Sequence, residues 1–197
     1  MVTTIILARH GETDWNRERR IQGHADQPLN ETGRSQAVAL ARLLEGERLD
    51  AVYASDLSRA GETARLATEG RGLPVIPLAG LRERHFGSWE GLTDDEARRR
   101  FPAQRLGERG DGEALDAMSS RVISCLLSIA AGHPGGTVLV VAHGGPLHAV
   151  LVHCGLREHG PVGNCEVVRL EVEAERLVLV GDLDVHRVPV GESPTTT

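Results

Sequence analysis

The sequence predicts an α/β fold, a three-layer sandwich with a mainly parallel central sheet and helices on both faces. Two continuous apolar runs, Thr3–Ala8 and Thr137–Ala142, are typical of strands that are buried on both faces. Between such runs lie segments with helical periodicity, for example Ser35–Leu44, whose apolar residues form one stripe. Because strands alternate with helices, we expect parallel strands whose ligands bind beyond their carboxyl ends.

The first half of the chain continues this alternation after the helix at Ser35–Leu44. Asp50–Ala54 and Pro74–Leu78 are the second and third expected strands. Between them, Ser55 is expected to cap a helix that runs to about Glu69, because its hydroxyl can accept hydrogen bonds from the first free amides.

The second half of the chain contains a long amphipathic helix and the strongest strand. The elements expected there are a charged helix at Asp94–Arg100 that stops near Pro102, a loop at Arg105–Gly112, a helix from Leu115 to the turn at Gly132–Gly136, the strand Thr137–Ala142, a helix at Gly144–Cys154, and strands at Glu166–Val172 and Leu177–Leu183. We expect one domain over residues 1–188 and a flexible tail at 189–197, which is polar and rich in Pro and Thr.

Composition excludes several classes of function. Hydrophobic residues make up 40% and charged residues 25% of the chain, which is typical of a globular protein. Acidic residues outnumber basic ones by 28 to 22, so the chain lacks the positive footprint of a nucleic-acid-binding protein. The chain has no lysine, which excludes a Walker A lysine, a Schiff base or a lysine general base.

The compartment is expected to be the cytoplasm. The three cysteines form no Cys-x-x-Cys pair, so they support neither a disulfide framework nor a zinc knuckle. We find no signal peptide and no apolar stretch that approaches the length of a membrane span.

Two predicted core strands end in a histidine followed by glycine. These are Arg9-His10-Gly11-Glu12 and His143-Gly144-Gly145. Glycine at such a place lets an anion approach backbone amides closely. One His-Gly pair alone is more often a strand cap, but two of them, one beside an arginine, favour a function. Arg59 near a helix start is compatible either with a bound anion or with a solvated surface.

These residues also occur in the order of a known family. The chain resembles the phosphoglycerate mutase-like, or histidine phosphatase, superfamily at Arg9-His10-Gly11-Glu12-Thr13, Asn16, Gln22-Gly23, Ser55-Asp56-Leu57-Ser58-Arg59-Ala60, Glu83, Phe86-Gly87-Ser88-Trp89-Glu90-Gly91 and His143-Gly144. The resemblance extends from about Ile5 to Leu170 and implies the same α/β fold, with its site at the carboxyl edge of the sheet.

The resemblance also implies roles for the residues. His10 would be the nucleophile that becomes phosphohistidine, a role that suits neutral imidazole near pH 7. Glu83 would be the general acid and then the base, and Glu90 is the rival carboxylate, which we interpret as structural. The expected phosphoryl clamp is Arg9, Arg59 and His143, and the expected substrate or phosphate contacts are Gly11, Asn16, Gln22, Gly23 and Gly144.

The expected activity is that of a metal-independent phosphatase without a cofactor. Its substrate would be a small phosphorylated metabolite, and related branches act on α-ribazole phosphate, glucosyl-3-phosphoglycerate or phosphoserine. The short spacing from Glu83 to His143 and the absence of lysine favour a phosphatase over a mutase. A mutase, a non-catalytic phospholigand-binding module and a metal-dependent phosphatase remain alternatives. We expect no nucleic-acid or membrane partner and a possible homodimer.

Overall fold

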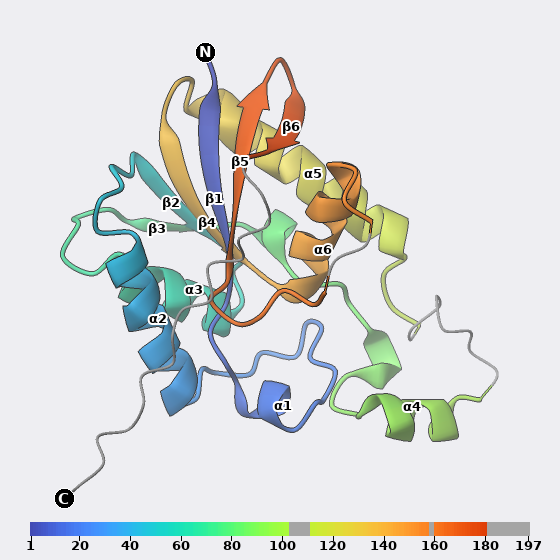
Figure 1. Cartoon of the computed structure of the whole chain (residues 1–197). Helices are drawn as coiled ribbons and strands as arrows, with labels where there is room; N and C mark the ends of the chain where they lie inside the picture. The colour runs from blue at the N-terminus through green and yellow to red at the C-terminus, as the bar shows by residue number, and fades with distance from the viewer. Residues whose placement is uncertain (103–110, 158–159, 181–197) are drawn as a thin grey trace, which may run out of the picture.

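Six strands form one sheet in the order β3-β2-β4-β1-β5-β6 (Figure 1). This computed structural model describes residues 1–102, 111–157 and 160–180. The strands are β1 (Thr3–Arg9), β2 (Ala51–Ala54), β3 (Val75–Pro77), β4 (Thr137–Ala142), β5 (Val167–Glu173) and β6 (Arg176–Leu179). The pairs β1–β4, β4–β2 and β2–β3 are parallel, whereas β5 and β6 are antiparallel to their neighbours. The sheet is therefore mainly parallel, as predicted.

Helices cover both faces of this sheet, so the three-layer prediction is confirmed. One layer consists of α2 (Glu31–Leu43) and α3 (Ser58–Ala67), and the other of α5 (Leu115–Gly132) and α6 (Gly144–His153). Alternate residues of β1 divide between the two cores because successive side chains of a strand point to opposite faces. Ile5 and Leu7 pack in the core under α5 and α6, and Ile6 packs in the core under α2 and α3.

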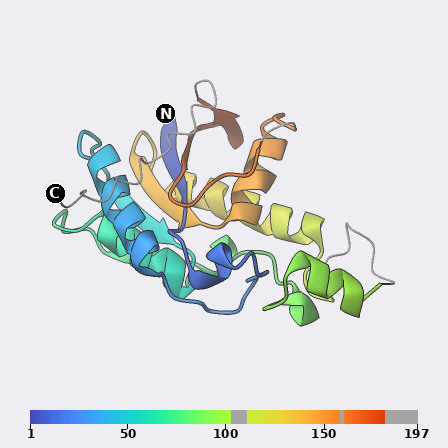
Figure 2. The same ribbon diagram turned by 60° about the horizontal axis from the view of Figure 1, so that its bottom comes forward.

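Short elements follow the carboxyl ends of β1 and of the edge strand β3. They are α1 (Asp14–Arg17), the 3₁₀ turns η1 (Ala79–Leu81) and η2 (Gly87–Trp89), and α4 (Asp94–Arg100). Figure 2 turns this edge toward the viewer and shows α1 in front of the sheet and α4 to one side. Helix α1 is not predicted from the sequence, since it has only four residues; it begins with a capping box between Thr13 and Asn16.

Two helix starts differ from the prediction because of capping contacts. The first, α2, begins at Glu31 rather than Ser35, since Asn30 accepts a hydrogen bond from the amide of Gly33. The second, α3, begins at Ser58, and its N-cap is Leu57 rather than the expected Ser55. Its first amide and the Ser58 hydroxyl both donate to Asp26 Oδ1, at 2.8 and 2.7 Å. The prediction of Ser55 as the cap is therefore wrong, and a carboxylate from a distant loop takes that place.

The expectation that no stretch reaches the length of a membrane span overlooked α5. Within the described ranges, α5 is the one helix that is long and apolar enough to cross a membrane by length and composition, with a mean hydropathy of 1.3 over 18 residues. Length and composition alone are weak evidence for a membrane span. Of this stretch 28% is buried, including Met118, Val122 and Leu126, which pack in the core under α5 and α6. Most of the expected loop at 105–112 and the tail at 189–197 lie outside the described residues, so the domain boundary at 188 stays a prediction.

Candidate active site

The two strand-end histidines meet because β1 and β4 are parallel neighbours. Their register pairs Arg9 with Ala142, and the amide of His10 donates to the Ala142 carbonyl at 3.0 Å. The residues that follow each strand therefore lie side by side at the carboxyl edge of the sheet. The rings of His10 and His143 are buried, with centroids 5.1 Å apart in an edge-to-face arrangement.

The proton on the His10 ring is placed by a backbone contact. Nδ1 of His10 lies 2.7 Å from the carbonyl oxygen of Gly11. A carbonyl can only accept, so Nδ1 carries the hydrogen and Nε2 keeps its lone pair. Burial, and then the charges of Arg9 and Arg59, hold the pKa of His10 well below its usual 6.5. The ring is therefore neutral near pH 7, with Nε2 available as a nucleophile.

The backbone of Gly11 has a different use from the expected phosphate contact. Its amide donates to the hydroxyl of Thr63 at 3.0 Å, and that hydroxyl donates to the Arg59 carbonyl at 2.7 Å. A side chain at Gly11 would meet the Gly33 carbonyl at 2.4 Å, so only glycine fits here. Gly11 thus orients His10, and its amide is not free for an anion.

Two arginines, the half-buried Arg9 and the fully buried Arg59, supply positive charge beside the histidines. Arg9 donates to the Val162 carbonyl at 2.7 Å, and Arg59 donates to the carbonyls of Ala25 and Gly23 at 2.9 and 2.8 Å. Carbonyl oxygens carry no formal charge, so these contacts leave both positive charges in place. Burial lowers the pKa of Arg59 to about 10, which leaves it protonated at neutral pH.

Several polar atoms of these residues are buried without a hydrogen-bond partner. They are Nε of Arg9, Nε of Arg59, both ring nitrogens of His143 and Oε1 of Gln22. An unpaired buried polar group costs about 1–3 kcal/mol, so a group of them at one sheet edge indicates a ligand. The arginine nitrogens are donors that suit an oxyanion. The Gln22 oxygen is an acceptor that suits a hydroxyl group.

Glu83 reaches this edge from the irregular segment after η1. Its Oε2 accepts from the amide of Gly145, at the start of α6, at 3.0 Å, and its Oε1 accepts from the amide of Arg84 at 2.8 Å. Its charge also raises the pKa of Arg9 and Arg59 against the larger effect of burial. The carboxyl group is thus fixed next to the helix that His143 precedes.

Glu90 has a structural role, as interpreted from the sequence. Its two oxygens accept from three backbone amides, those of His24 and Ala25 at 2.9 Å and that of Phe86 at 3.0 Å. These bonds join the 22–25 loop to the segment that carries Glu83. A Cβ at Gly23, whose φ is +54°, would meet the same carboxylate at 2.1 Å.

The remaining expected contacts lie around this centre. Gly144 lies beside the Arg9 guanidinium, since a Cβ there would be 3.6 Å from Arg9 Nε. Asn164 connects Asn16 to the nucleophile segment, since its side-chain amide donates to the His10 carbonyl at 2.9 Å and to Asn16 Oδ1 at 3.3 Å. Asn164 is not predicted from the sequence, because no local pattern marks an amide side chain that binds the backbone just after β1 from the other end of the chain. Thr63 carries a weak signal, since it follows Arg59 by one helical turn.

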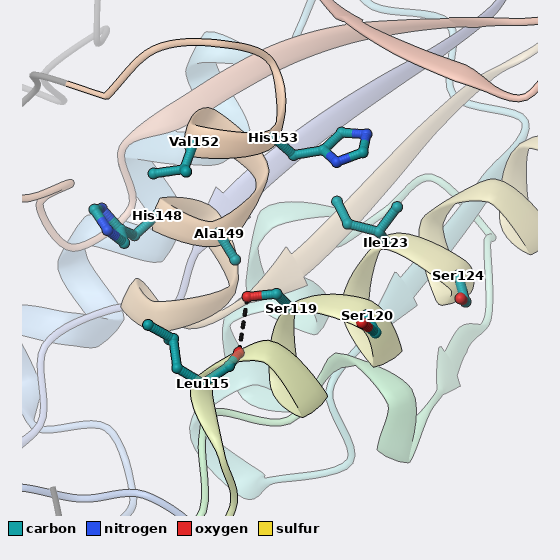
Figure 3. Close-up of a pocket in the computed structure, with 9 residues that line it drawn as sticks. All are labelled: Leu115, Ser119, Ser120, Ile123, Ser124, His148, Ala149, Val152 and His153. Atoms are coloured by element: carbon teal, nitrogen blue, oxygen red, sulfur yellow. Dashed lines mark hydrogen bonds between the residues drawn. The ribbon is translucent and has the colours of Figure 1, made fainter. Parts of the chain in front are cut away.

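A separate groove of about 490 Å³ lies between α5 and α6 (Figure 3). It is lined by Leu115, Ser119, Ser120, Ile123, Ser124, His148, Ala149, Val152 and His153, none of which belongs to the strand-end group. His148 and His153 of α6 therefore line a groove apart from the strand-end group that contains His143. Within the ranges that the structure describes, no group of three or more His, Cys, Asp or Glu side chains could hold a metal.

The buried neutral histidines predict a loss of stability in acid. Burial holds the pKa of His10 and of His143 below that of the unfolded chain, so the unfolded chain binds protons first as the pH falls below about 6.5. Each histidine should lower the free energy of unfolding by about 1.4 kcal/mol per pH unit until its folded-state pKa is reached. Denaturant titrations from pH 7.5 to 5 measure this slope. In the variant His10→Asn, this slope should be smaller by the contribution of one histidine. An unchanged slope would contradict the assignment of His10 as a buried, neutral histidine.

Comparisons with known proteins agree with this architecture. The model of the histidine phosphatase superfamily (branch 1) matches residues 5–182. A metal-independent phosphoserine phosphatase of Arabidopsis thaliana is 44% identical over 160 residues, which cover 76% of this chain and 67% of that protein. A glucosyl-3-phosphoglycerate phosphatase of Mycobacterium tuberculosis is 37% identical over 161 residues, with 74% and 72% covered.

The solved structure of YhfR from Bacillus stearothermophilus is similar over nearly the whole chain. It superimposes with a TM-score of 0.83 at 36% identity, covering 90% of this chain and 95% of that one. This agreement extends across the sheet and both helical layers.

Proposed function

The chain belongs to the histidine phosphatase superfamily, and on that premise we propose that it hydrolyses a small-molecule phosphomonoester through a phosphohistidine at His10. The observation that supports this most is the group of buried, unpartnered nitrogens of Arg9, Arg59 and His143 around a neutral His10. A phosphoryl group brings the oxygen acceptors and the negative charge that this group lacks.

In the first step, Nε2 of His10 attacks phosphorus and the bond from phosphorus to the ester oxygen breaks. The proton of the Glu83 carboxyl group moves to that oxygen, so the product leaves as a neutral alcohol. Arg9 and Arg59 stabilise the charge on the phosphoryl oxygens, and a ring N–H of His143 donates to one of them. Positioning and charge stabilisation are the main requirements of phosphoryl transfer.

In the second step, water attacks the phosphohistidine. The Glu83 carboxylate left by the first step takes a proton from that water, the bond from nitrogen to phosphorus breaks, and inorganic phosphate departs. Both His10 and Glu83 return to their starting protonation states. The two backbone amides on Glu83 keep its carboxyl group in place between the steps.

The class of substrate is proposed from the relatives and from the site. The two phosphatases reported above are named for phosphoserine and for glucosyl-3-phosphoglycerate, which are small metabolites with further polar groups. The buried acceptor of Gln22 suits a hydroxyl of such a substrate. We therefore propose a small polar metabolite as substrate and hydrolysis, rather than transfer within the substrate, as outcome.

We expect the purified protein to hydrolyse p-nitrophenyl phosphate with no loss of rate in EDTA and with inhibition by vanadate. A panel of phosphorylated metabolites, with phosphoserine and glucosyl-3-phosphoglycerate among them, then ranks substrates by released phosphate. Isomerisation of 3-phosphoglycerate without phosphate release would identify a mutase. Binding without turnover would identify a phospholigand module, and inactivation by EDTA would identify a metal-dependent enzyme. Sedimentation of the same sample tests the expected homodimer.

A further inference from the structure

The segment that carries Glu83 has little regular structure of its own. It follows the three-residue turn η1 and precedes η2, so its carbonyl groups lack the partners that a helix or a sheet supplies. Its backbone must nevertheless be held in one place, because the Glu83 carboxyl group works only at a fixed distance from the ester oxygen. The groups that hold these carbonyls are therefore of interest for the reaction.

Arg121, from the middle of α5, binds three carbonyls of this segment. Its Nη1 donates to the carbonyls of Gly80 and Arg82, each at 3.0 Å, and its Nη2 donates to that of Glu83 at 3.3 Å. Nε2 of His24 donates to the same Glu83 carbonyl at 2.9 Å. One guanidinium thus fixes the backbone on both sides of Arg82 and at Glu83 itself.

Glu113 holds the other edge of that guanidinium. Its carboxylate forms a bidentate pair with Arg121, with Nε to Oε1 at 2.9 Å and Nη2 to Oε2 at 2.7 Å. The backbone of Glu113 binds the same segment, since its amide donates to the His85 carbonyl at 2.8 Å and its carbonyl accepts from Arg84 Nε at 2.6 Å. The side chains are only 26% and 21% exposed, so solvent competes little with this planar pair.

We infer that Arg121, oriented by Glu113, is a positioning residue that sets the Glu83 carboxyl group for proton transfer. This inference rests on the proposed function of Glu83. Among the described residues, the hydrogen bonds of Arg121 go to backbone carbonyls and to Glu113, so we assign it an action through the Glu83 segment and not on the reacting atoms. A guanidinium is suited to this task because its five N–H donors lie in one rigid plane, whereas a lysine ammonium carries three donors on a flexible stem and cannot form a bidentate pair with Glu113 in the same fixed geometry.

The test is the effect of Arg121→Met on two esters with different leaving groups. The value of kcat/KM for an alkyl ester, β-glycerophosphate, depends on proton donation more than the value for p-nitrophenyl phosphate does. We expect the alkyl-to-aryl ratio of kcat/KM to fall about 10- to 100-fold in Arg121→Met, as for a misplaced catalytic group. Arg121→Lys should restore only part of the ratio. Glu113→Gln should lower it in the same direction, and this variant also serves if Arg121→Met does not fold.

The matched control is Arg169→Met. Arg169 forms a pair with Glu47 at 2.6 Å, with side chains 35% and 31% exposed, on a part of the fold that does not contact Glu83. This variant should leave the ratio unchanged even if it lowers the melting temperature. If Arg121→Met lowers stability in the same way and the ratio stays at the wild-type value, the positioning role is overturned.

A double variant separates the proposed acid role of Glu83 from the positioning role of Arg121. If Arg121 acts through Glu83, Arg121→Met should have no further effect on the ratio in a Glu83→Gln background. An undiminished effect in that background would overturn the inference. If Glu83→Gln alone leaves the ratio unchanged, the proposed acid role of Glu83 fails instead, and with it the basis of the inference. If Glu83→Gln lowers the ratio and Arg121→Met does not, only the positioning role fails.

Discussion

Replacement of His10 by alanine is expected to lower turnover by roughly four orders of magnitude or more, because it removes the nucleophile that forms the covalent intermediate. Nε2 of His10 is the unprotonated ring nitrogen, since Nδ1 donates to the Gly11 carbonyl, and the low pKa of the ring keeps it neutral. The wild-type protein, quenched during turnover, should contain phosphate that is stable in base and labile in acid. The variant should contain none.

The control for this experiment is a histidine outside the strand-end group. His153 lies at the end of α6 and lines the separate groove, so His153→Ala should retain both turnover and the phosphoprotein. Circular dichroism of His10→Ala would test whether this variant is folded. A folded His10→Ala protein with more than a trace of activity, or with an acid-labile phosphate, would refute the nucleophile assignment.

Local patterns were sufficient to predict the architecture. The runs Thr3–Ala8 and Thr137–Ala142 consist mostly of apolar residues that are buried on both faces, and short runs of this kind are typical of central strands of a covered sheet. Parallel pairing of these strands follows from the helices between them, and it brings His10 beside His143. The part of the site that lies at strand ends was therefore predictable, because strand direction fixes where those residues lie.

Contacts between distant segments were not predictable in the same way. Asp26, not Ser55, accepts the hydrogen bond from the first amide of α3, and no local pattern marks this contact. Thr63 accepts from the amide of Gly11, and its only sequence signal is its position one helical turn after Arg59. The same holds for Arg121, which lies on an amphipathic helix whose pattern reports only burial. Such side chains satisfy backbone groups of irregular loops, and the shape of those loops is known only once the fold is formed.

Replacement of Glu83 by glutamine is expected to lower kcat/KM for alkyl phosphates by about 10² to 10⁴, and that for p-nitrophenyl phosphate by less than about tenfold. An alkoxide is a poor leaving group and requires a proton, whereas p-nitrophenolate departs without one. The amide keeps the size of the side chain, and its oxygen can still accept from the amide of Gly145 or of Arg84, so the change removes mainly the proton. Steady-state kinetics with both esters measure the difference.

The second step supplies an independent measure of the same residue. Without the Glu83 carboxylate, water lacks its base, so the phosphohistidine formed from p-nitrophenyl phosphate should accumulate in Glu83→Gln. Glu90→Gln is the matched carboxylate control, because Glu90 binds three backbone amides of the adjacent loops and should affect both esters equally. An equal loss for both esters in Glu83→Gln would contradict the role of Glu83 as proton donor. So would a loss specific to the alkyl ester in Glu90→Gln, which would indicate Glu90 as the donor.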